Sequence, residues 1–499
     1  MNSKAYLAFD LGAGSGRAML GVLADGKLSL HELHRFENNM HLLPDGYHWD
    51  TLGLWANLKQ GLTAAGKYCG ENGLELTSLG VDTWGVDFGL IGRSGSLIGL
   101  PWAYRDPRND AAMAKVIDRI GAEKLYAATG IQFMPFNTLF QLSAFLESEP
   151  TVLRQARKLL FMPDLLHYFF TGNATNEATI ASTSQMIDPR PKNSKWANDL
   201  LDELDIPRRM LGKIVQPGSV IGTLRAEVAE ECGVSANIRV IAPASHDTAS
   251  AVAAVPADPA TKWVFLSSGT WSLMGAELKE PVLNDSARKA NFTNEGGVSK
   301  TIRFLKNIAG MWLIQELKRA FDKAGSSMDY AKLTDLAGKA EAFGALVDPS
   351  FGPFMQPGDM PGKIAEFAGK TGQPVPQSEG QFVRCCLESL AMTYRMTLEG
   401  LEKVLGQRFD VIHIVGGGGK NELLDQMTAD ATGRTVVVGP YEATAAGNLL
   451  VQAMGAGDVK DLAQLRQVVA ASFGVKKFTP GDGAAWDVAY KRYLGLIGK

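Results

Sequence analysis

The sequence predicts an α/β protein built from two similarly organised halves, and three observations carry this prediction. The chain opens with a short apolar strand, residues 5–9, which leads into a glycine-rich turn and a return strand. The same order of strand, small-residue turn and strand begins again at residue 262. Near the end, a buried-strand pattern at 411–415 leads into four glycines and then a helical pattern. Strands that alternate with helices through glycine-rich connections are typical of α/β folds.

Composition narrows the functional classes. The chain has 499 residues, 45% of them apolar and 21% charged, so a large core can form. Basic and acidic side chains number 50 and 53, which gives no reason to expect a nucleic-acid or anionic-membrane surface. The first apolar run ends at Asp10, too early for a secretory signal, and no stretch reaches the roughly 18 apolar residues of a membrane helix. We therefore expect a cytoplasmic protein, monomeric or a simple homo-oligomer.

The cysteines do not form a recognisable framework. The four of them, at positions 69, 232, 385 and 386, show no zinc-binding spacing. A bridge between Cys69 and Cys232 is conceivable but disfavoured in a reducing compartment.

Local signals predict the individual elements. In the first half, Asp25-Gly26 predicts a hairpin turn within a meander of three strands, and Asp50 predicts the N-cap of a helix over 51–68. A strand over 76–86 and helical pattern over 109–128 follow. In the second half, Ser378 and Gln381 predict a capping box for a long helix that ends at Gly406. The remaining expectations are a Gly- and Pro-rich surface loop over 355–377, helices over 421–431 and 442–454, and a strand over 435–438.

The first glycine loop has glycines at positions 12, 14 and 16. It lacks the GxxxxGK[ST] spacing of a P-loop, and the strand pattern that follows it excludes a dinucleotide fingerprint, which requires a helix there. Backbone N–H groups beside such small residues form an anion site, and Asp10 at the strand end suits a hydrated Mg²⁺ bound to phosphates. A simple tight turn explains the segment equally well.

Two further turns carry the same alternatives. Small hydroxyl residues at 267–270 suit a phosphate, although alone they also suit a plain turn. The four glycines at 416–419 let a flat ligand such as adenosine approach the backbone before a helix N-terminus. A tight strand–helix connection needs one glycine rather than four, which favours the binding interpretation.

Asp247 is the candidate base. It lies at the first turn of a small-residue helix, where an aspartate is either an N-cap or a general base for a substrate hydroxyl. His246 either orients a sugar hydroxyl or is a satisfied buried histidine. The aromatic residues of segment 81–88 either line a sugar pocket or belong to the core. The rival carboxylates are Asp82, Asp87, Asp106 and Asp164.

Taken together, these motifs resemble the FGGY carbohydrate kinases of the actin/hexokinase-like ATPase superfamily. The segments DLGAGSGR (10–17), SSGTWSLMG (267–275) and HIVGGGGKNELL (413–424) carry the resemblance. Further matching segments lie at 81–88, 103–108, 130–142, 162–172, 244–252, 291–297, 305–316 and 439–448. The set spans nearly the whole chain and is most similar to the members that phosphorylate L-rhamnulose.

The resemblance implies a fold and a set of roles. The implied fold is two ribonuclease H-like (actin-like ATPase) domains, residues 1–245 and 246–499, each a mixed five-stranded sheet flanked by helices, with a cleft between them. Asp247 matches the catalytic base and Asp10 the acidic residue associated with Mg²⁺. The implied ATP contacts are Ala13, Gly14, Ser15, Gly16, Arg17, Thr270, Gln315 and Gly417. The implied sugar contacts are Gly85, His246, Asp247, Thr248 and, at the sugar or phosphate edge, Asn307. Gly419 departs from the pattern and is expected to lengthen the flexible stretch.

The implied reaction moves the γ-phosphoryl group of ATP to O1 of L-rhamnulose, with Asp247 as base. Closure of the cleft would exclude water and suppress hydrolysis of ATP. Two alternatives remain open at this point. One is a kinase of the same family for another ketose or polyol, such as L-fuculose, L-xylulose or glycerol. The other is an actin-like ATPase that uses nucleotide as a conformational switch and turns over ATP without any sugar.

Overall fold

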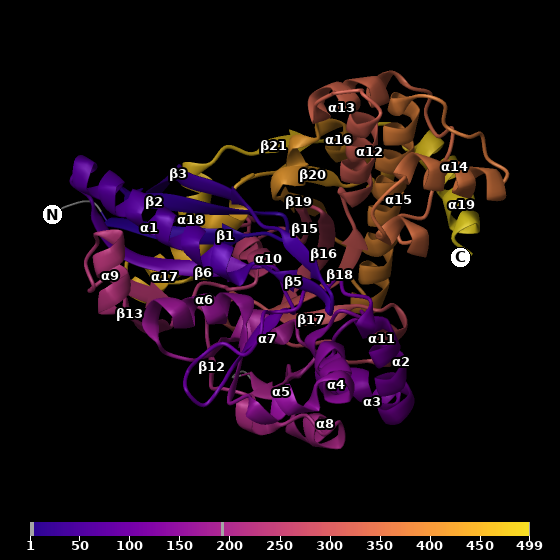
Figure 1. Ribbon diagram of the computed structural model, residues 1–499. Helices are drawn as coiled ribbons and strands as arrows, with labels where there is room; N and C mark the ends of the chain where they lie inside the picture. Colours follow the sequence, from indigo (N-terminus) through magenta and orange to yellow (C-terminus); the bar gives the residue numbers. More distant parts are fainter. Residues whose placement is uncertain (1–3, 191–193, 499) are drawn as a thin grey trace. The chain divides into compact units, whose positions relative to one another are not determined.

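The computed structural model describes residues 4–190 and 194–498 (Figure 1). The chain divides into two compact units, each discontinuous in sequence. Unit 1 comprises Met1–Pro256, Glu277–Phe304 and Ala443–Phe473, and unit 2 comprises Ala257–Ala276, Leu305–Glu442 and Gly474–Lys499. These units differ from two linear segments because the chain re-enters unit 1 twice. The linear division into 1–245 and 246–499 stays a prediction.

Unit 1 is built on a six-stranded sheet in the order β13-β14-β6-β1-β2-β3. Strands β1, β2 and β3 form the predicted antiparallel meander, and β6 and β14 pair in parallel beyond β1. The strands are β1 (Lys4–Leu11), β2 (Ser15–Ala24), β3 (Lys27–Glu37), β6 (Glu75–Thr83), β13 (Val220–Thr223) and β14 (Arg239–Ile241).

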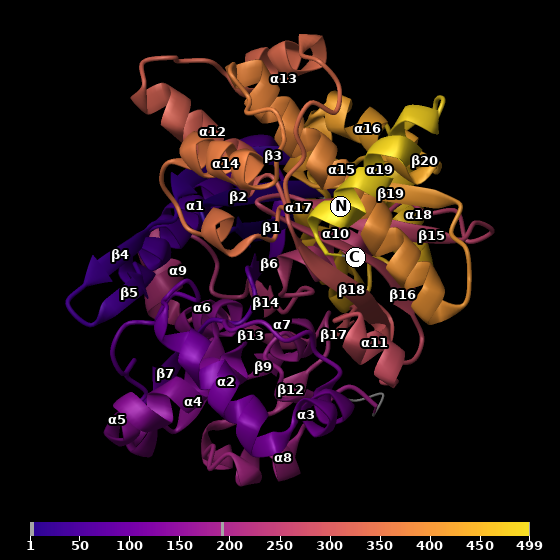
Figure 2. The same cartoon turned by 90° about the vertical axis from the view of Figure 1, so that its right-hand side faces the viewer.

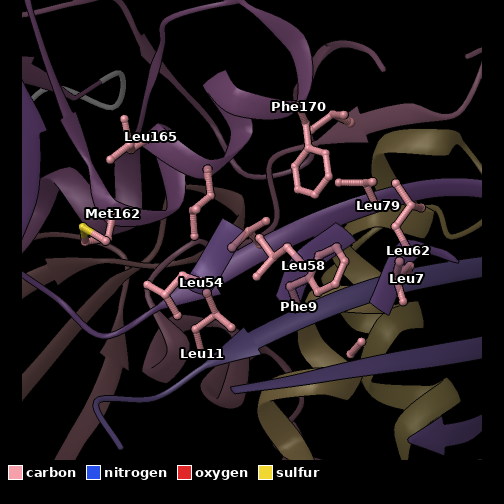
Figure 3. Packing of buried hydrophobic residues seen from close by; sticks show 14 of the residues in the cluster. Leu7, Phe9, Leu11, Leu54, Leu58, Leu62, Leu79, Met162, Leu165 and Phe170 are labelled. Carbon is pink, nitrogen blue, oxygen red and sulfur yellow. The ribbon is translucent and has the colours of Figure 1, made fainter. Parts of the chain in front are cut away.

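Helix α1 (Thr51–Asn72) covers one face of this sheet. As predicted, Asp50 caps it, its Oδ1 accepting from the N–H of Gly53 at 2.8 Å. The helix ends at Asn72, four residues beyond the predicted end, and is followed by a left-handed Gly73. Figure 3 shows the apolar side chains that the helix and the sheet bury together, among them Leu7, Phe9, Leu11, Leu54, Leu58 and Leu62.

Helix α17 (Ala443–Ala456) covers the opposite face and fits there through close contacts at glycines. A Cβ on Gly21 of β2 would lie 2.7 Å from Leu449. A Cβ on Gly447 would lie 1.9 Å from the carbonyl oxygen of Ser250 in helix α10 (Asp247–Ala253). These contacts explain why a segment from near the end of the chain belongs to unit 1.

The rest of unit 1 surrounds a second apolar cluster beside this sheet. The predicted helical stretch 109–128 is two helices, separated at Gly121. The remaining strands are β4 (Met40–Leu43), β5 (Gly46–Trp49), β7 (Phe88–Ile91), β8 (Lys158–Phe161), β9 (Asn176–Glu177), β10 (Ile187–Asp188), β11 (Lys195–Trp196), β12 (Ile214–Val215) and β17 (Thr293–Gly296). The remaining helices are α2 (Arg108–Ile120), α3 (Ala122–Thr129), α4 (Thr138–Ser148), α5 (Pro150–Gln155), α6 (Met162–Thr171), α7 (Ala178–Ser182), α8 (Asn198–Glu203), α9 (Ala226–Cys232), α11 (Asp285–Lys289) and α18 (Leu462–Ser472).

Unit 2 contains most of a seven-stranded sheet in the order β17-β18-β16-β15-β19-β20-β21, while β17 and the first three residues of β18 belong to unit 1. Strand β15 pairs antiparallel with β16 and parallel with β19, as β1 pairs with β2 and β6. The strands are β15 (Trp263–Ser268), β16 (Trp271–Leu278), β18 (Ile302–Ala309), β19 (Val411–Val415), β20 (Thr435–Val438) and β21 (Lys476–Phe478).

Helix α15 (Glu379–Leu405) is the longest in the described chain, and its predicted capping box and terminal Gly406 are confirmed. It packs against α13 (Tyr330–Lys339) and α16 (Glu422–Thr432) (Figure 2). The surface loop expected over 355–377 is wrong in part, because α14 (Met360–Lys370) lies within it. Asp359 caps α14, and its Ile364 is fully buried, so an apolar face outweighs the Gly and Pro signals. The other helices are α12 (Trp312–Lys323) and α19 (Ala484–Leu496).

The α/β class is confirmed, and so is the repeat between the halves. In each sheet, five strands lie in the order third, second, first, fourth and fifth along the chain, which is the ribonuclease H-like arrangement. The expected count of five strands per sheet is too low, because β13 extends one sheet and β17 and β21 extend the other. No helix in the described part of the chain is long and apolar enough to span a membrane.

Candidate functional site

In unit 1 the glycine loop is the turn between β1 and β2. The N–H of Gly12 donates to the carbonyl of Ser15 at 2.9 Å, and the side chain of Asn38 donates to the carbonyl of Gly12 at 2.9 Å. Gly14 and Ser15 are exposed at the tip. Gly16 is buried, and a Cβ there would lie 2.3 Å from the ring of Phe36. Packing therefore requires Gly16, while the open space beside Gly14 suits a ligand.

Two carboxylates lie side by side below this loop. Asp10 on β1 and Asp82 on β6 are partners in the parallel pairing of the strands. Arg17 holds Asp10 through an ion pair of 2.6 Å between Nη2 and Oδ2. Asn448 of α17 donates to Asp82 Oδ2 at 2.5 Å, while the buried Asp82 Oδ1 has no hydrogen-bond partner in the described structure. Burial raises the pKa of Asp82 well above its usual range, and the charges of Asp10 and Asp247 raise it further.

Asp247 is the first residue of α10 and is not its N-cap. The cap is His246, which makes no side-chain cap bond. Asp247 Oδ1 accepts from the N–H of Thr248 at 2.5 Å and from its Oγ1 at 3.1 Å, and lies 3.4 Å from His246 Nε2. Thr83, at the end of β6, bridges to His246, which brings Asp247 close to the carboxylates at the ends of β1 and β6.

Gly85 follows β6 in a strained turn. Val86 has a φ of +68°, a conformation that is costly for a β-branched residue and is typical of functional sites. The hydroxyl of Thr183 holds this turn: its Oγ1 accepts the N–H of Val86 at 3.0 Å and itself donates to the carbonyl of Ile180. A Cβ on Gly85 would lie 3.3 Å from Thr183, so this half-buried position favours glycine.

The other rival carboxylates have structural partners. Asp87 accepts hydrogen bonds from the indoles of Trp49 and Trp84, the amide of Gln141 and the N–H of Tyr104, and burial raises its pKa to about 6. Asp106 accepts from two backbone N–H groups, and Asp164 accepts from the N–H of Glu177. Trp84 and Phe88 are buried in the two apolar clusters, so the core interpretation of the aromatic residues holds.

In unit 2, Thr270 lies in the turn between β15 and β16. Its Oγ1 is 3.3 Å from both side-chain polar atoms of Gln315 on α12, so the structure brings these two predicted contacts together. Close packing at Gly310 fixes the start of α12 against this turn, since a Cβ there would lie 2.6 Å from the backbone of Trp271. Asn307 lies half-buried on β18, and its role stays a prediction.

The four glycines after β19 have different functions in the structure. Gly416 has a φ of +91°. A Cβ on Gly418 would lie 2.0 Å from Ser268 Oγ, and one on Gly419 would lie 2.7 Å from Val438. The expectation that Gly419 adds flexibility is wrong, because it is buried in the short 3₁₀ helix Gly417–Lys420. Gly417 is exposed and has open space around it, which leaves it as the position that suits a ligand.

Sequence reasoning missed several groups that hold this site. Asn448, Thr183, Glu295 and Arg303 contact the predicted residues but were not assigned a role. Arg303 carried a usable signal, since it lies between the apolar residues Ile302 and Phe304 of β18, and it is fully buried, whereas the strand's other charged residue, Lys306, is half-buried. All four cysteines are buried free thiols.

Comparison with known proteins adds family information to this geometry. Residues 5–254 match the N-terminal domain, and residues 264–456 the C-terminal domain, of the FGGY family of carbohydrate kinases. Rhamnulokinase of Bacteroides thetaiotaomicron is 44% identical over 492 residues, covering 99% of both chains. Rhamnulokinase of Bacillus subtilis is 38% identical over 477 residues, covering 96% of both.

Solved structures share the fold at low identity. Gluconate kinase from Lactobacillus acidophilus has a TM-score of 0.80 at 15% identity, covering 100% of this chain and 98% of that one. Plasmodium falciparum glycerol kinase with ADP has a TM-score of 0.77 at 16% identity, covering 100% and 97%.

Proposed function

Because the chain belongs to the FGGY family of carbohydrate kinases, we propose that it transfers the γ-phosphoryl group of ATP to O1 of L-rhamnulose. The products are L-rhamnulose 1-phosphate and ADP. The rhamnulokinases that are 38–44% identical over nearly the whole chain support this substrate over another ketose or a polyol.

The observation that carries the proposal is that only one of the two carboxylate oxygens of Asp247 is hydrogen-bonded. Thr248 occupies its Oδ1 with two hydrogen bonds, whereas within the described residues no hydrogen bond reaches Oδ2. About a third of the side chain is exposed, at 31%. A carboxylate with one oxygen fixed and the other accessible suits a general base. We assign Oδ2 as the atom that accepts the proton of the O1 hydroxyl as that oxygen attacks the γ-phosphorus.

The phosphate and nucleoside contacts follow from the open glycines. We assign residues 13–17, exposed at Gly14 and Ser15, and the hydroxyl of Thr270 to the ATP phosphates, and Gly417 to the adenosine side. At residues 13–15 the side chains are small or absent, so backbone N–H groups can approach an anion. Gly85, His246 and Thr248 are assigned to the sugar, and Gln315 supports Thr270. Asn307 is assigned to the sugar or phosphate edge.

The residues beside Asp10 fit a magnesium ion. Asp10 and the unpartnered Oδ1 of Asp82 are carboxylate oxygens, the donor type that Mg²⁺ prefers. Among the described residues no group of three His, Cys, Asp or Glu side chains is placed to hold a metal. Mg²⁺ is commonly held by one or two carboxylates together with water and substrate phosphates. When bound, Mg²⁺ supplies charge neutralisation to those phosphates.

The test is ADP release by the purified protein with Mg²⁺ and ATP. The panel comprises L-rhamnulose, L-fuculose, L-xylulose, L-ribulose, D-xylulose and glycerol, with a blank that lacks sugar. We expect kcat/KM for L-rhamnulose to exceed that of every other acceptor by at least about tenfold, since a pocket built for one pattern of hydroxyls rejects others. Preference for another acceptor would overturn the substrate, and equal turnover in the blank would favour a switch ATPase.

A further inference from the structure

A series of buried charged side chains in unit 1 leads to His246 and so to Asp247. Arg303 of β18 is fully buried and Glu295 of β17 nearly so, at 0% and 6% side-chain exposure. Their side chains pair at 3.1 Å between Nη2 and Oε2. The same Arg303 Nη2 lies 3.1 Å from His246 Nδ1, and His246 Nε2 lies 3.4 Å from Asp247 Oδ1.

The hydrogen bond from Arg303 fixes the protonation pattern of His246. A guanidinium has donors only and keeps its proton in proteins, so Nδ1 must accept this bond. In a neutral imidazole the proton is then on Nε2, the nitrogen that faces Asp247. Glu295 Oε2 also lies 3.3 Å from Nδ1, so a protonated Nδ1 that donates to this carboxylate is the alternative that the test must exclude.

Glu295 explains how a charged arginine is tolerated at this depth. An unpaired buried cation is costly, and the carboxylate compensates its charge. Burial acts to raise the pKa of Glu295, yet its charged and hydrogen-bonding surroundings, to which the charge of Arg303 contributes most, outweigh burial, so the pKa is lowered. The N–H of Arg303 Nε also donates to the carbonyl of Gly296 at 2.8 Å, which fixes the guanidinium plane.

We infer that Arg303 and Glu295 are positioning residues, which hold His246 as the Nε2–H tautomer, with Nε2 lying 3.4 Å from the Asp247 carboxylate. No hydrogen bond or ion pair among the described residues joins either of them to Asp247, although the charges of Arg303 and Asp247 interact directly. The His246→Ala background in the test below separates that direct effect from an effect through His246. The inference deepens the proposed function and rests on it for its kinetic consequence. The tautomer itself is a property of the protein without substrate.

The first arm of the test is therefore independent of activity. The chain has seven histidines, so ¹⁵N-histidine labelling gives a small set of signals, and the His246→Gln variant identifies the one that disappears. We expect a protonated Nε2 and an unprotonated Nδ1 at neutral pH. In the double variant Arg303→Met/Glu295→Leu we expect a mixture of tautomers. A protonated Nδ1 in the wild type would overturn the inference.

The second arm is kinetic. The double variant removes both charges together, so neither is left buried and unpaired. We expect kcat to fall at least about 30-fold with KM for ATP unchanged, and His246→Gln, which keeps an amide donor near the Nε2 position, to retain more activity than His246→Asn. When Arg303→Met/Glu295→Leu is added to a His246→Ala protein, we expect kcat to fall by less than about threefold relative to His246→Ala alone. An equal loss in both backgrounds, or wild-type kcat in the double variant, would contradict positioning through His246.

A second ion pair in unit 1 provides the matched control. Arg466 Nη2 lies 3.0 Å from Glu277 Oε2, and both side chains are largely buried. Arg466→Met/Glu277→Leu should alter thermal stability while kcat stays within about twofold of wild type, as expected for a pair outside the site. If the wild type fails to phosphorylate L-rhamnulose, the proposed function fails, and the nitrogen spectrum alone then decides the inference.

Discussion

The two sheets share one strand order but use the ends of equivalent strands in opposite ways. In unit 1, β1 and β6 end in a pair of carboxylates, Asp10 and Asp82, one of which is ion-paired with Arg17. In unit 2, β15 ends in Ser268 and β19 is followed at once by the glycine turn, and Ser268 lies so close to that turn that Gly418 has no room for a side chain.

The same strand order therefore presents two kinds of groups, ionisable side chains in unit 1 and bare backbone in unit 2. Ionisable groups at strand ends change charge or stabilise charge during a reaction, whereas missing side chains let a ligand approach the backbone. Changes at the carboxylates of unit 1 should therefore lower kcat, and changes at the glycine turn of unit 2 should raise KM for ATP. The following predictions test that division.

Asp247→Asn should give the largest effect. The amide keeps the size of the side chain but cannot accept the proton of O1, so kcat should fall at least about 10³-fold, within the range of general-base contributions. ATP binding without sugar, measured by calorimetry, should stay within about twofold. A kcat within tenfold of wild type would show that another group is the base.

Asp10→Asn should give the next largest effect and test the carboxylate side of the comparison. Losing this charge beside Arg17 should lower kcat about 10²-fold and raise the Mg²⁺ concentration needed for half-maximal rate. A magnesium titration at saturating ATP measures both. Unchanged magnesium dependence would assign Asp10 to its ion pair with Arg17 alone.

Two neighbouring glycines test the unit 2 side. Gly417→Ala adds a methyl group in open space, so KM for ATP should rise about three- to tenfold with unchanged stability. Gly418→Ala places its Cβ 2.0 Å from Ser268 Oγ, so overpacking should lower the free energy of unfolding by about 1–3 kcal/mol. Denaturant unfolding and ATP kinetics on both variants separate binding from packing, and identical behaviour of the pair would remove the distinction.

Much of this arrangement was predictable because its signals are local. The Asp50 cap, the capping box at Ser378 and the two hairpins depend on residues within a few positions of one another. Helix α14 was missed because an apolar face outweighed Gly and Pro, which composition alone cannot show. The return of α17 to unit 1 depends on contacts between residues hundreds of positions apart, such as Asn448 with Asp82.

The candidate site shows the same difference between local signals, which the sequence contains, and long-range contacts, which it does not show. Family resemblance supplied residues along the chain, but it did not show that Gly416, Gly418 and Gly419 serve packing and Gly417 alone of the four is open. Nor did it separate Asp82, at the strand end beside Asp10, from Asp87, whose carboxylate is occupied by indoles and an amide. That distinction needs the partners of each oxygen, which only the folded chain provides.

The smallest predicted effect concerns a buried acid of unit 2 outside the assigned contacts. Burial raises the pKa of Asp425 on α16 to about 8, and its Oδ2 has no hydrogen-bond partner in the described structure. Between the unfolded pKa of about 4 and this value, the native state holds one more proton than the unfolded state, so the free energy of unfolding falls as pH rises across that window.

Asp425→Asn does not titrate, so it should remove this fall. We expect the free energy of unfolding of the variant, relative to that of wild type, to rise by at least about 1 kcal/mol from pH 6 to pH 8.5. Denaturant unfolding at both pH values measures this difference, and kcat at pH 7 should be unchanged. A parallel pH dependence of the two proteins would show that Asp425 is ionised in the native state at neutral pH. A fall in kcat would instead show that an ionisable group of unit 2, Asp425, contributes to the reaction. The division of chemistry between the two sheets would then be wrong.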